Sequence, residues 1–183
     1  ESKRSQGFIA YTSDYKYFDI EDILVDTQGK DGFVVVLNEI LDPHNLGSII
    51  RVCECAGVDG IVIGKDRSAS VNDTVMRISA GALNHVKVAR VVNINTAIDK
   101  LKDNGYWVYG AEVGGQEIYK ANLTGKLCLV IGGEDSGVKR LTKENCDGVI
   151  SIPMFGKVNS LNASVACGIA VYEVVRQRVL KDK

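Results

Sequence analysis

Residues 151–169 have the sequence SIPMFGKVNSLNASVACGI and are the most informative part of the chain. A short β-like run stops at Pro153, and a loop rich in glycine, lysine and asparagine follows it. Ser160, Leu161 and Asn162 then lead into a helix of small and apolar residues. A loop of small polar groups between a buried strand and a buried helix is a usual place for a ligand in α/β proteins. The stretch therefore predicts an α/β fold with a binding site at this loop.

Two earlier stretches have the same character. Residues 42–51 have the sequence DPHNLGSIIR, and residues 131–137 have the sequence IGGEDSG. Each of them follows an apolar, β-like run. Because ligands in open α/β sheets bind outside the carboxyl ends of the strands, we expect all three stretches to meet at one edge of the sheet.

The remainder of the chain alternates between β-like and helical patterns. The expected strands are residues 33–37, 60–63, 86–92, 107–111, 127–131 and 149–152, and the expected helices are residues 45–56, 72–79, 94–104 and 162–180. Continuous apolar runs such as residues 33–37 suit strands that are covered on both faces. The alternation predicts a mostly parallel sheet flanked by helices, in one domain of residues 32–183.

Residues 1–31 are polar and aromatic with weak periodicity, and residues 7–11 are expected to form an edge strand. We expect residues 1–31 to be a linker and N-terminal extension. The start, ESKR, has no methionine and resembles the middle of a linker. We therefore expect a further N-terminal part that is absent from this chain.

Composition places the chain among ordinary soluble globular proteins, with 45% hydrophobic and 25% charged residues. The net charge of −1 argues neither for nor against a nucleic-acid partner. No segment resembles a signal peptide or a run of about 20 apolar residues, so no membrane span is expected. We expect a cytoplasmic protein.

The five cysteines are odd in number, and most of them lie in apolar runs. Cys53 and Cys55 fall about 200° apart on a predicted helix, so they cannot hold one metal ion together. Reduced thiols in the core of a cytoplasmic protein are the expected state. No metal-ligand cluster is present in the sequence pattern, and no metal is expected.

In the first polar stretch, Asn45, Gly47 and Arg51 carry the strongest local signal. Gly47 and Arg51 are one helical turn apart, and a helical side chain leans toward the N-terminus of its helix. The Arg51 guanidinium would then lie over the bare Gly47 and join the free backbone N–H groups at the helix start, a setting that favours a phosphate. The alternative is an asparagine N-cap and an arginine paired with a surface carboxylate.

The other two stretches are weaker signals by themselves. Residues 132–137, which include Glu134, lack both the dinucleotide fingerprint and the P-loop lysine, and a glycine-rich turn before a helix would also explain them. Ser160 and Asn162 would equally serve as caps of the last helix. Each stretch alone therefore leaves the function open.

Together, the three stretches resemble one known family in order and spacing. The segments DPHNLGSIIR, LVIGGEDSGVKRL and SIPMFGKVNSLNASVACGIAVYE are similar to the three signature motifs of the SpoU (TrmH) family, RNA ribose 2′-O-methyltransferases of the SPOUT class. The resemblance covers residue 32 to the C-terminus. It is greatest to the RlmB-type enzymes of large-subunit ribosomal RNA, in which a small RNA-binding domain precedes the linker.

The resemblance implies a SPOUT fold whose C-terminal trefoil knot binds S-adenosylmethionine. The residues that match the catalytic set of the family are Asn45, Arg51, Glu134, Ser160 and Asn162. Those that match its cofactor contacts are Gly132, Ile152 and Leu161, with Ala111 and Met154 nearby. We expect Arg51 to hold an RNA phosphate and to stabilise the developing alkoxide. Whether Arg51, a phosphate oxygen or water takes the proton stays open.

The predicted reaction is methyl transfer from S-adenosylmethionine to a ribose 2′-hydroxyl, at a guanosine of large-subunit ribosomal RNA. The alternatives are a transfer RNA ribose methyltransferase and a catalytically silent RNA-binding module for ribosome assembly. A silent module should have lost Asn45, Arg51 or Asn162, and all three are present. A nucleotide-binding enzyme of dehydrogenase type would need the glycine fingerprint that is missing.

The expected partners are RNA and a second copy of the chain. The resemblance implies a homodimer with its site near the interface. The last helix carries more apolar and small residues than one core face requires, and Ala166, Gly168 and Ala170 would let another backbone approach closely. We therefore expect a dimer held largely by apolar helix faces.

Overall fold

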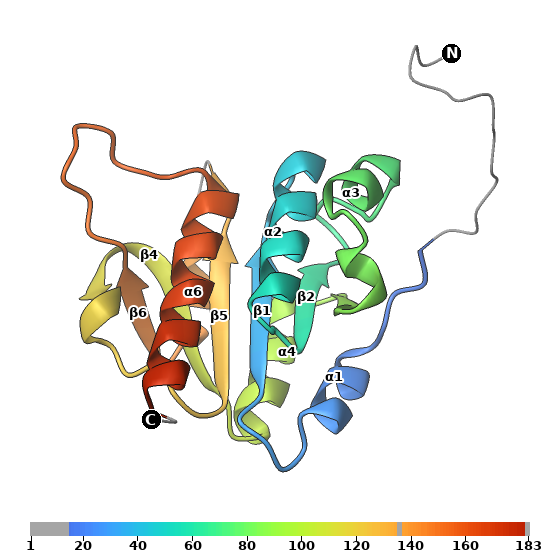
Figure 1. The fold of residues 1–183 in the computed structure, drawn as a ribbon, viewed down its shortest axis with the longest axis horizontal. Helices are drawn as coiled ribbons and strands as arrows, with labels where there is room; N and C mark the ends of the chain where they lie inside the picture. Colours follow the sequence, from blue (N-terminus) through green and yellow to red (C-terminus); the bar gives the residue numbers. More distant parts are fainter. Residues whose placement is uncertain (1–14, 135–136, 182–183) are drawn as a thin grey trace.

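The computed structural model describes residues 15–134 and 137–181 and shows within them one parallel sheet of six strands. The strands are β1 (Phe33–Asn38), β2 (Gly60–Gly64), β3 (Lys87–Val91), β4 (Trp107–Glu117), β5 (Leu127–Gly132) and β6 (Gly148–Ser151). They lie in the order β3-β2-β1-β5-β4-β6, and every neighbouring pair is parallel. The predicted parallel α/β sheet is confirmed (Figure 1), while the trefoil knot stays a prediction.

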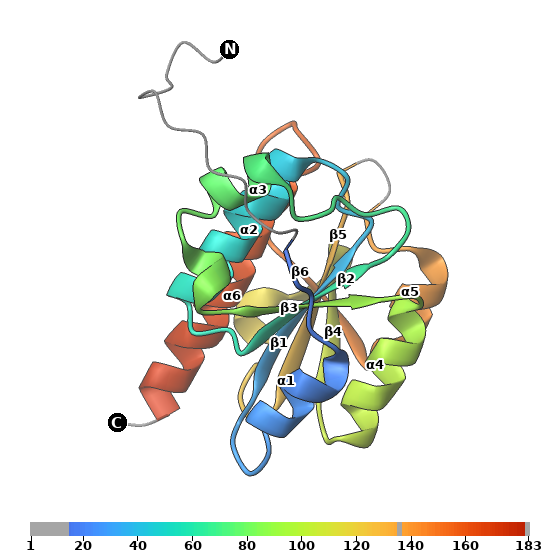
Figure 2. The same ribbon diagram turned by 90° about the vertical axis from the view of Figure 1, so that its right-hand side faces the viewer.

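Helices cover both faces of the sheet. They are α1 (Ile20–Asp26), α2 (Pro43–Cys55), α3 (Asp73–Ile78), α4 (Ile94–Asp103), α5 (Arg140–Asn145) and α6 (Ala163–Lys181), with short 3₁₀ turns at Ala82–Asn84 and Ile118–Lys120. The helices α2, α3 and α6 lie on one side, and α1, α4 and α5 lie on the other (Figure 2). Each face of the sheet therefore has a hydrophobic core of its own.

The central strand β1 explains why the sequence has a continuous apolar run. Phe33, Val35 and Leu37 point into the core beneath α2 and α6. Val34 and Val36 point into the core beneath α1 and α4. Because successive side chains of a strand point to opposite faces, a strand buried on both faces must be apolar at every position.

The strand order changes direction between β1 and β5. The chain places β2 and β3 outward from β1 toward one edge, and it builds β4, β5 and β6 on the other side of β1. The register pairs Asn38 at the end of β1 with Gly132 at the end of β5. In open α/β sheets, ligands bind outside the carboxyl ends of the strands at such a switch point. The fold therefore places a binding crevice near Asn38 and Gly132.

Residues 15–31 contain a helix that the sequence pattern does not predict. Asp19 is the N-cap residue of α1, and its N–H donates to the Asp22 carboxylate at 2.9 Å. The helix buries Ile20 and Ile23, and Ile23 fills the space beside Gly60. A part of the expected extension thus packs against the sheet. The edge strand expected at residues 7–11 lies outside the described residues.

The start of α2 differs from the expectation. The helix begins at Pro43, and the N-cap is Asp42, whose Oδ1 accepts a hydrogen bond from the His44 N–H at 2.9 Å. Proline is favoured at the first helical position because its missing N–H needs no partner there. Asn45 therefore lies inside the first turn and is not the N-cap that the sequence suggested. Its side chain is available for hydrogen bonds across the site.

Gly47 allows two helices to come into contact. A Cβ at Gly47 would lie 2.8 Å from the Cβ of Ile78 in α3 and 3.2 Å from the carbonyl oxygen of Val75. The side chain that covers Gly47 is therefore that of Ile78, and not that of Arg51 as the sequence suggested. The absence of a side chain at Gly47 serves the packing of α2 against α3.

All five cysteines have free thiols. Cys53, Cys128 and Cys167 are buried, and burial raises the pKa of the half-buried Cys146 to about 11. Across residues 15–134 and 137–181, no cluster of three or more histidine, cysteine or acidic side chains is arranged to hold a metal ion. No helix in this described part combines the length and the apolar character that crossing a bilayer requires.

Candidate active site

A cavity of about 600 Å³ opens at the carboxyl ends of β4, β5 and β6. In the sheet register, Ala111 of β4 lies beside both Ile131 of β5 and Ile150 of β6, and all three line the cavity. Further lining comes from the loop after β5 and from the segment that joins β6 to α6. That segment rises from the end of β6 and crosses to the start of α6 (Figure 1).

All five residues that the family resemblance marks as cofactor contacts line this one cavity. They are Ala111, Gly132, Ile152, Met154 and Leu161. They come from β4, from the end of β5 and from the segment between β6 and α6, so only the folded chain brings them together. Their side chains are apolar or absent, and the cavity walls therefore suit a ligand with a flat or aliphatic part.

The loop after β5 bends tightly at two glycines. A Cβ on Gly132 would overlap the backbone of Gly137, so no larger residue fits there. Gly137 has a φ of 56°, in the left-handed region that glycine adopts without steric cost. The Gly137 N–H donates to the Gly133 carbonyl oxygen at 2.9 Å, which closes the turn.

Two polar side chains hold this loop against the sheet, and no sequence motif identifies either of them. Glu112 of β4 accepts a hydrogen bond from the Val138 N–H at 2.9 Å through Oε2. The buried Asn38 of β1 accepts one from the Lys139 N–H at 2.8 Å through Oδ1. Their partners are 26 and 101 residues away in the chain, so no local pattern could have found them.

Three side chains, one from each polar stretch, meet in a hydrogen-bonded group that we call the polar cluster: Asn45, Glu134 and Asn162. Asn45 Nδ2 donates to Glu134 Oε1 at 2.9 Å, and Asn162 Nδ2 donates to the same oxygen at 2.6 Å. Asn162 Nδ2 also donates to Asn45 Oδ1 at 2.9 Å. Two neutral amides thus fix one carboxylate. The expectation that the three stretches meet at one edge of the sheet is confirmed.

Asn162 combines the two roles that the sequence left as alternatives. Its Oδ1 accepts hydrogen bonds from the Ser164 N–H at 3.0 Å and the Val165 N–H at 3.3 Å, which caps α6. Its Nδ2 donates into the polar cluster at the same time. The start of α6 and the position of the Glu134 carboxylate are therefore set by one side chain.

Arg51 and Ser160 lie apart from the polar cluster. Arg51 is exposed and makes no hydrogen bond or ion pair with the residues of 15–134 and 137–181. It follows Asn45 by six residues, which places it about 9 Å farther along α2 and on another side of the helix. Ser160 is exposed and lines the cavity. One chain therefore assembles three of the five predicted catalytic side chains.

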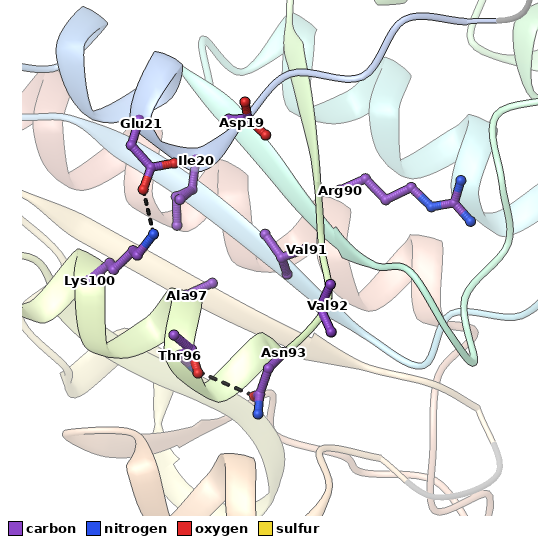
Figure 3. A pocket seen from close by; sticks show the side chains of 10 residues that line it. All are labelled: Asp19, Ile20, Glu21, Arg90, Val91, Val92, Asn93, Thr96, Ala97 and Lys100. Atoms are coloured by element: carbon purple, nitrogen blue, oxygen red, sulfur yellow. Dashed lines mark hydrogen bonds and ion pairs between the residues drawn. The ribbon is translucent and has the colours of Figure 1, made fainter.

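A second hollow of about 420 Å³ lies beside α1, β3 and α4, at the other end of the strand order (Figure 3). Its polar groups are largely engaged with one another. Lys100 pairs with Glu21, and Asn93 Oδ1 accepts hydrogen bonds from the N–H groups of Asn95 and Thr96. These contacts fasten α4 to α1 and cap α4. The candidate active site is therefore the cavity at the ends of β4, β5 and β6.

Comparison with known proteins gives concordant matches. The model of the SpoU rRNA Methylase family matches residues 32–172. A protein of Staphylococcus saprophyticus, assigned to the TrmH family of tRNA/rRNA methyltransferases, is 46% identical over 176 residues, which cover 94% of this chain and 71% of that protein.

Two solved structures are similar over most of the chain. The SpoU methyltransferase AviRb from Streptomyces viridochromogenes, in complex with AdoMet, matches with a TM-score of 0.77 and 29% identity over 82% of this chain and 59% of AviRb. A TrmH/SpoU tRNA modifying enzyme of A. aeolicus matches with a TM-score of 0.74 and 29% identity, over 89% of this chain and 84% of that enzyme. This chain thus spans less than two thirds of AviRb.

Proposed function

Because the chain belongs to the SpoU rRNA methylase family, we propose that it transfers a methyl group from S-adenosylmethionine to a ribose 2′-hydroxyl of RNA, at a guanosine of large-subunit ribosomal RNA. One observation carries the proposal: the cavity that gathers the five expected cofactor residues shares Glu134 with the polar cluster. A methyl donor in this cavity would therefore lie next to the groups that can orient a hydroxyl.

The lining of the cavity fits S-adenosylmethionine. Ile131, Ile152 and Leu161 offer apolar surface for the adenine ring, and the tight turn at Gly132 leaves backbone groups of the loop at the rim. The volume of about 600 Å³ lies in the range of small-molecule sites. When bound, the cofactor supplies a methyl group on a sulfonium leaving group. In-line transfer from it gains mainly from proximity and orientation.

The polar cluster would position the hydroxyl. Glu134 Oε1 already accepts two amide N–H groups, whereas its Oε2 accepts no hydrogen bond from the described residues. We assign Oε2 as the acceptor for the ribose 2′-hydroxyl. Arg51, which is exposed and unpaired among the described residues, would hold an RNA phosphate. Because it lies apart from the polar cluster of its own chain, RNA or a second subunit would bring it to the alkoxide, which it would stabilise as the proton leaves. No metal is needed for these roles.

The proposal includes a homodimer that forms through α6. Val165, Tyr172 and Val179 are 51%, 49% and 52% exposed, and their spacing of seven residues places them on one side of the helix. Such an exposed apolar row is a feature of interaction surfaces. Of the three small residues named from the sequence, Ala166 lines the larger cavity, and the other two contact the rest of the chain. Ala170 is buried, and a Cβ on Gly168 would lie 3.7 Å from Val52 of α2.

The same chemistry on transfer RNA is the second candidate. It is favoured by the relative from S. saprophyticus, whose description names both RNA classes, and by the structural similarity to the tRNA modifying enzyme of A. aeolicus. A silent RNA-binding module is a weaker candidate, because the polar cluster is complete in side chains and in hydrogen bonds. We place the reaction in the cytoplasm.

Ribose methylation mapping tests the proposal. RNA from cells with and without the full-length gene would be compared at every ribose of the ribosomal and transfer RNAs. We expect one or a few large-subunit guanosines to lose 2′-O-methylation when the gene is absent. A loss confined to transfer RNA would support the second candidate, and an unchanged methylation map would contradict both.

A further inference from the structure

A smaller cavity of about 300 Å³ adjoins the candidate active site on the other side of Glu134. The two cavities share Gly133, Glu134 and Ala163 in their linings. The smaller one also reaches Asn45, so the polar cluster lies between them. It occupies the space between the β1–α2 loop and the β5–α5 loop, where the strand order changes direction. Two compartments thus meet at the same carboxylate.

The charged groups that line the smaller cavity are mostly carboxylates. Glu39 and Asp42 line it together with Glu134, and Lys139 is its one basic lining residue among the described residues. Lys139 Nζ is 3.0 Å from a Glu39 carboxylate oxygen, so its charge is already paired. Arg67 pairs with the other Glu39 oxygen at 3.4 Å. This excess of carboxylates disfavours a phosphate and favours a neutral group that carries hydrogen-bond donors.

Asp42 is the acceptor best placed to meet such a group. Its Oδ1 accepts the His44 N–H, whereas Oδ2 accepts no hydrogen bond from the described residues. Beside it, Ile40 and Leu41 line the cavity with apolar surface. A planar ring with donors on its edge therefore matches both parts of the lining.

We propose that this cavity receives the base of the target nucleotide, turned out of the RNA structure, while its ribose lies at the polar cluster. The inference rests on the proposed function, because it assigns the second substrate of the same site. Enzymes that must reach a nucleotide commonly extrude it into a pocket. Asp42 accepts a hydrogen bond from an amino group of the base. Guanine, adenine and cytosine carry such a group and uracil does not, so uridine binds least well.

Nuclear magnetic resonance of the full-length protein, saturated with S-adenosylhomocysteine, tests the location. Guanosine, adenosine, cytidine, uridine and inorganic phosphate are the probes. We expect the three nucleosides with amino groups to shift the backbone amide signals of Leu41, Asp42 and Lys139, and to leave those of Arg90 and Asn93 unchanged. Equal shifts from phosphate alone would overturn the inference. So would nucleoside shifts confined to the larger cavity, or no shift at the solubility limit.

Asp42→Asn tests the recognition without removing the helix cap, because asparagine caps as well as aspartate. We expect the preference for amino-bearing nucleosides over uridine to fall by about tenfold or more, the effect of losing a hydrogen bond to a charged group. The matched control is Asp19→Asn. It changes the N-cap residue of α1, in the distant hollow (Figure 3), and should leave the preference intact.

Methyl transfer to RNA by the same proteins, supplied with S-adenosylmethionine in place of S-adenosylhomocysteine, separates the two proposals. If the wild-type protein methylates ribose while Asp42→Asn keeps the original base preference, the cavity assignment is wrong and the proposed function stands. If nucleosides bind at residues 40–42 but no methyl group reaches RNA, the cavity assignment stands and the proposed function is wrong.

Discussion

The polar cluster and Arg51 are two parts of one predicted catalytic set, but hydrogen bonds within the chain hold only the polar cluster in place. Asn45, Glu134 and Asn162 come from three distant segments, yet hydrogen bonds of 2.6 to 2.9 Å join them in a single chain. Arg51 shares a helix with Asn45 but is exposed, and no described residue pairs with it. The chain thus organises the neutral and acidic groups in advance. It leaves the cation to be positioned by RNA or by a second subunit.

The largest effect is expected from Arg51→Ala. If Arg51 holds a phosphate and stabilises the alkoxide, the single-turnover rate of methyl transfer should fall by a factor of about 10² to 10³, roughly 3 to 4 kcal/mol. S-adenosylmethionine affinity and the midpoint of thermal unfolding should hardly change, because Arg51 is exposed and makes no hydrogen bond or ion pair with the described residues. Arg51→Lys should restore little, since an ammonium lacks the planar fork of donors.

Arg140→Ala is the control for Arg51→Ala. Arg140 is also exposed, but it pairs with Glu144 one turn farther along α5, and it lines neither cavity. Its loss should change neither the rate nor the unfolding midpoint by much, because exposed ion pairs contribute about 0 to 1 kcal/mol. A near-normal rate for Arg51→Ala would remove Arg51 from the catalytic set.

Asn162→Asp should separate the cap of α6 from the polar cluster. Aspartate keeps an oxygen for the Ser164 and Val165 N–H groups, so the helix start should survive. It places a carboxylate against Glu134 in place of an N–H donor. A hydrogen bond to a charged group is worth about 1.5 to 3 kcal/mol, so methyl transfer should slow by about 10- to 100-fold. The rate of methyl transfer would be measured by stopped flow, and the free energy of unfolding by chemical denaturation, on the same protein. If the loss in unfolding free energy were as large as the loss in transition-state stabilisation, the cap and the polar cluster would not be separable roles.

Tyr172→Glu tests whether a second subunit is needed. A charged side chain in the middle of the exposed row of α6 should raise the dimer dissociation constant by about thirtyfold, the effect of losing roughly 2 kcal/mol at an interface. Analytical ultracentrifugation would measure it. Tyr119→Glu is the control, because Tyr119 is similarly exposed but lies in the 3₁₀ turn Ile118–Lys120. A wild-type protein that is monomeric at micromolar concentration would rule out this interface.

The smallest effect is expected from Gly47→Ala. The added methyl group would press on Ile78 of α3, at a typical cost of about 1 to 3 kcal/mol, offset by nearly 1 kcal/mol of helix propensity. A net loss of about 1 kcal/mol in unfolding free energy should leave methyl transfer unchanged. Gly168→Ala has room for its methyl group and should be neutral or stabilising. If Gly47→Ala slowed catalysis without destabilising the fold, Gly47 would have a role at the site.

Much of the fold could be predicted because the strands are apolar at every position. A run such as Phe33 to Leu37 predicts a strand that is covered on both faces, and the alternation of strands with helices indicates a parallel sheet. The missed helices have weak patterns for a physical reason. α1 buries only Ile20 and Ile23 in a polar segment, and α5 buries only Thr142. An amphipathic signal that depends on one or two residues is not visible in the sequence.

The site was predictable only as a set of residues, and not as a geometry. The three motifs identify Asn45, Glu134 and Asn162, but their hydrogen bonds span 28 to 117 residues of chain. The helix α2 begins at Pro43 and not at Asn45, because Asp42 supplies the N-cap and proline suits the first helical position. The roles of Asn38 and Glu112 could not be predicted, because each side chain binds a distant backbone N–H group. Every residue except proline has such a group, so the partner leaves no pattern in the sequence.

In the proposed reaction, the cavity and the polar cluster together deliver a methyl group to a ribose oxygen. To measure this directly, the full-length protein would be incubated with methyl-labelled S-adenosylmethionine and large-subunit ribosomal RNA in the presence of EDTA. The RNA would then be digested to nucleosides, and the labelled nucleoside would be identified by mass spectrometry. We predict label in 2′-O-methylguanosine, formed without a metal and lost in Arg51→Ala. The proposed reaction would be contradicted by label on a base. It would also be contradicted if the protein bound the cofactor but no label entered the RNA.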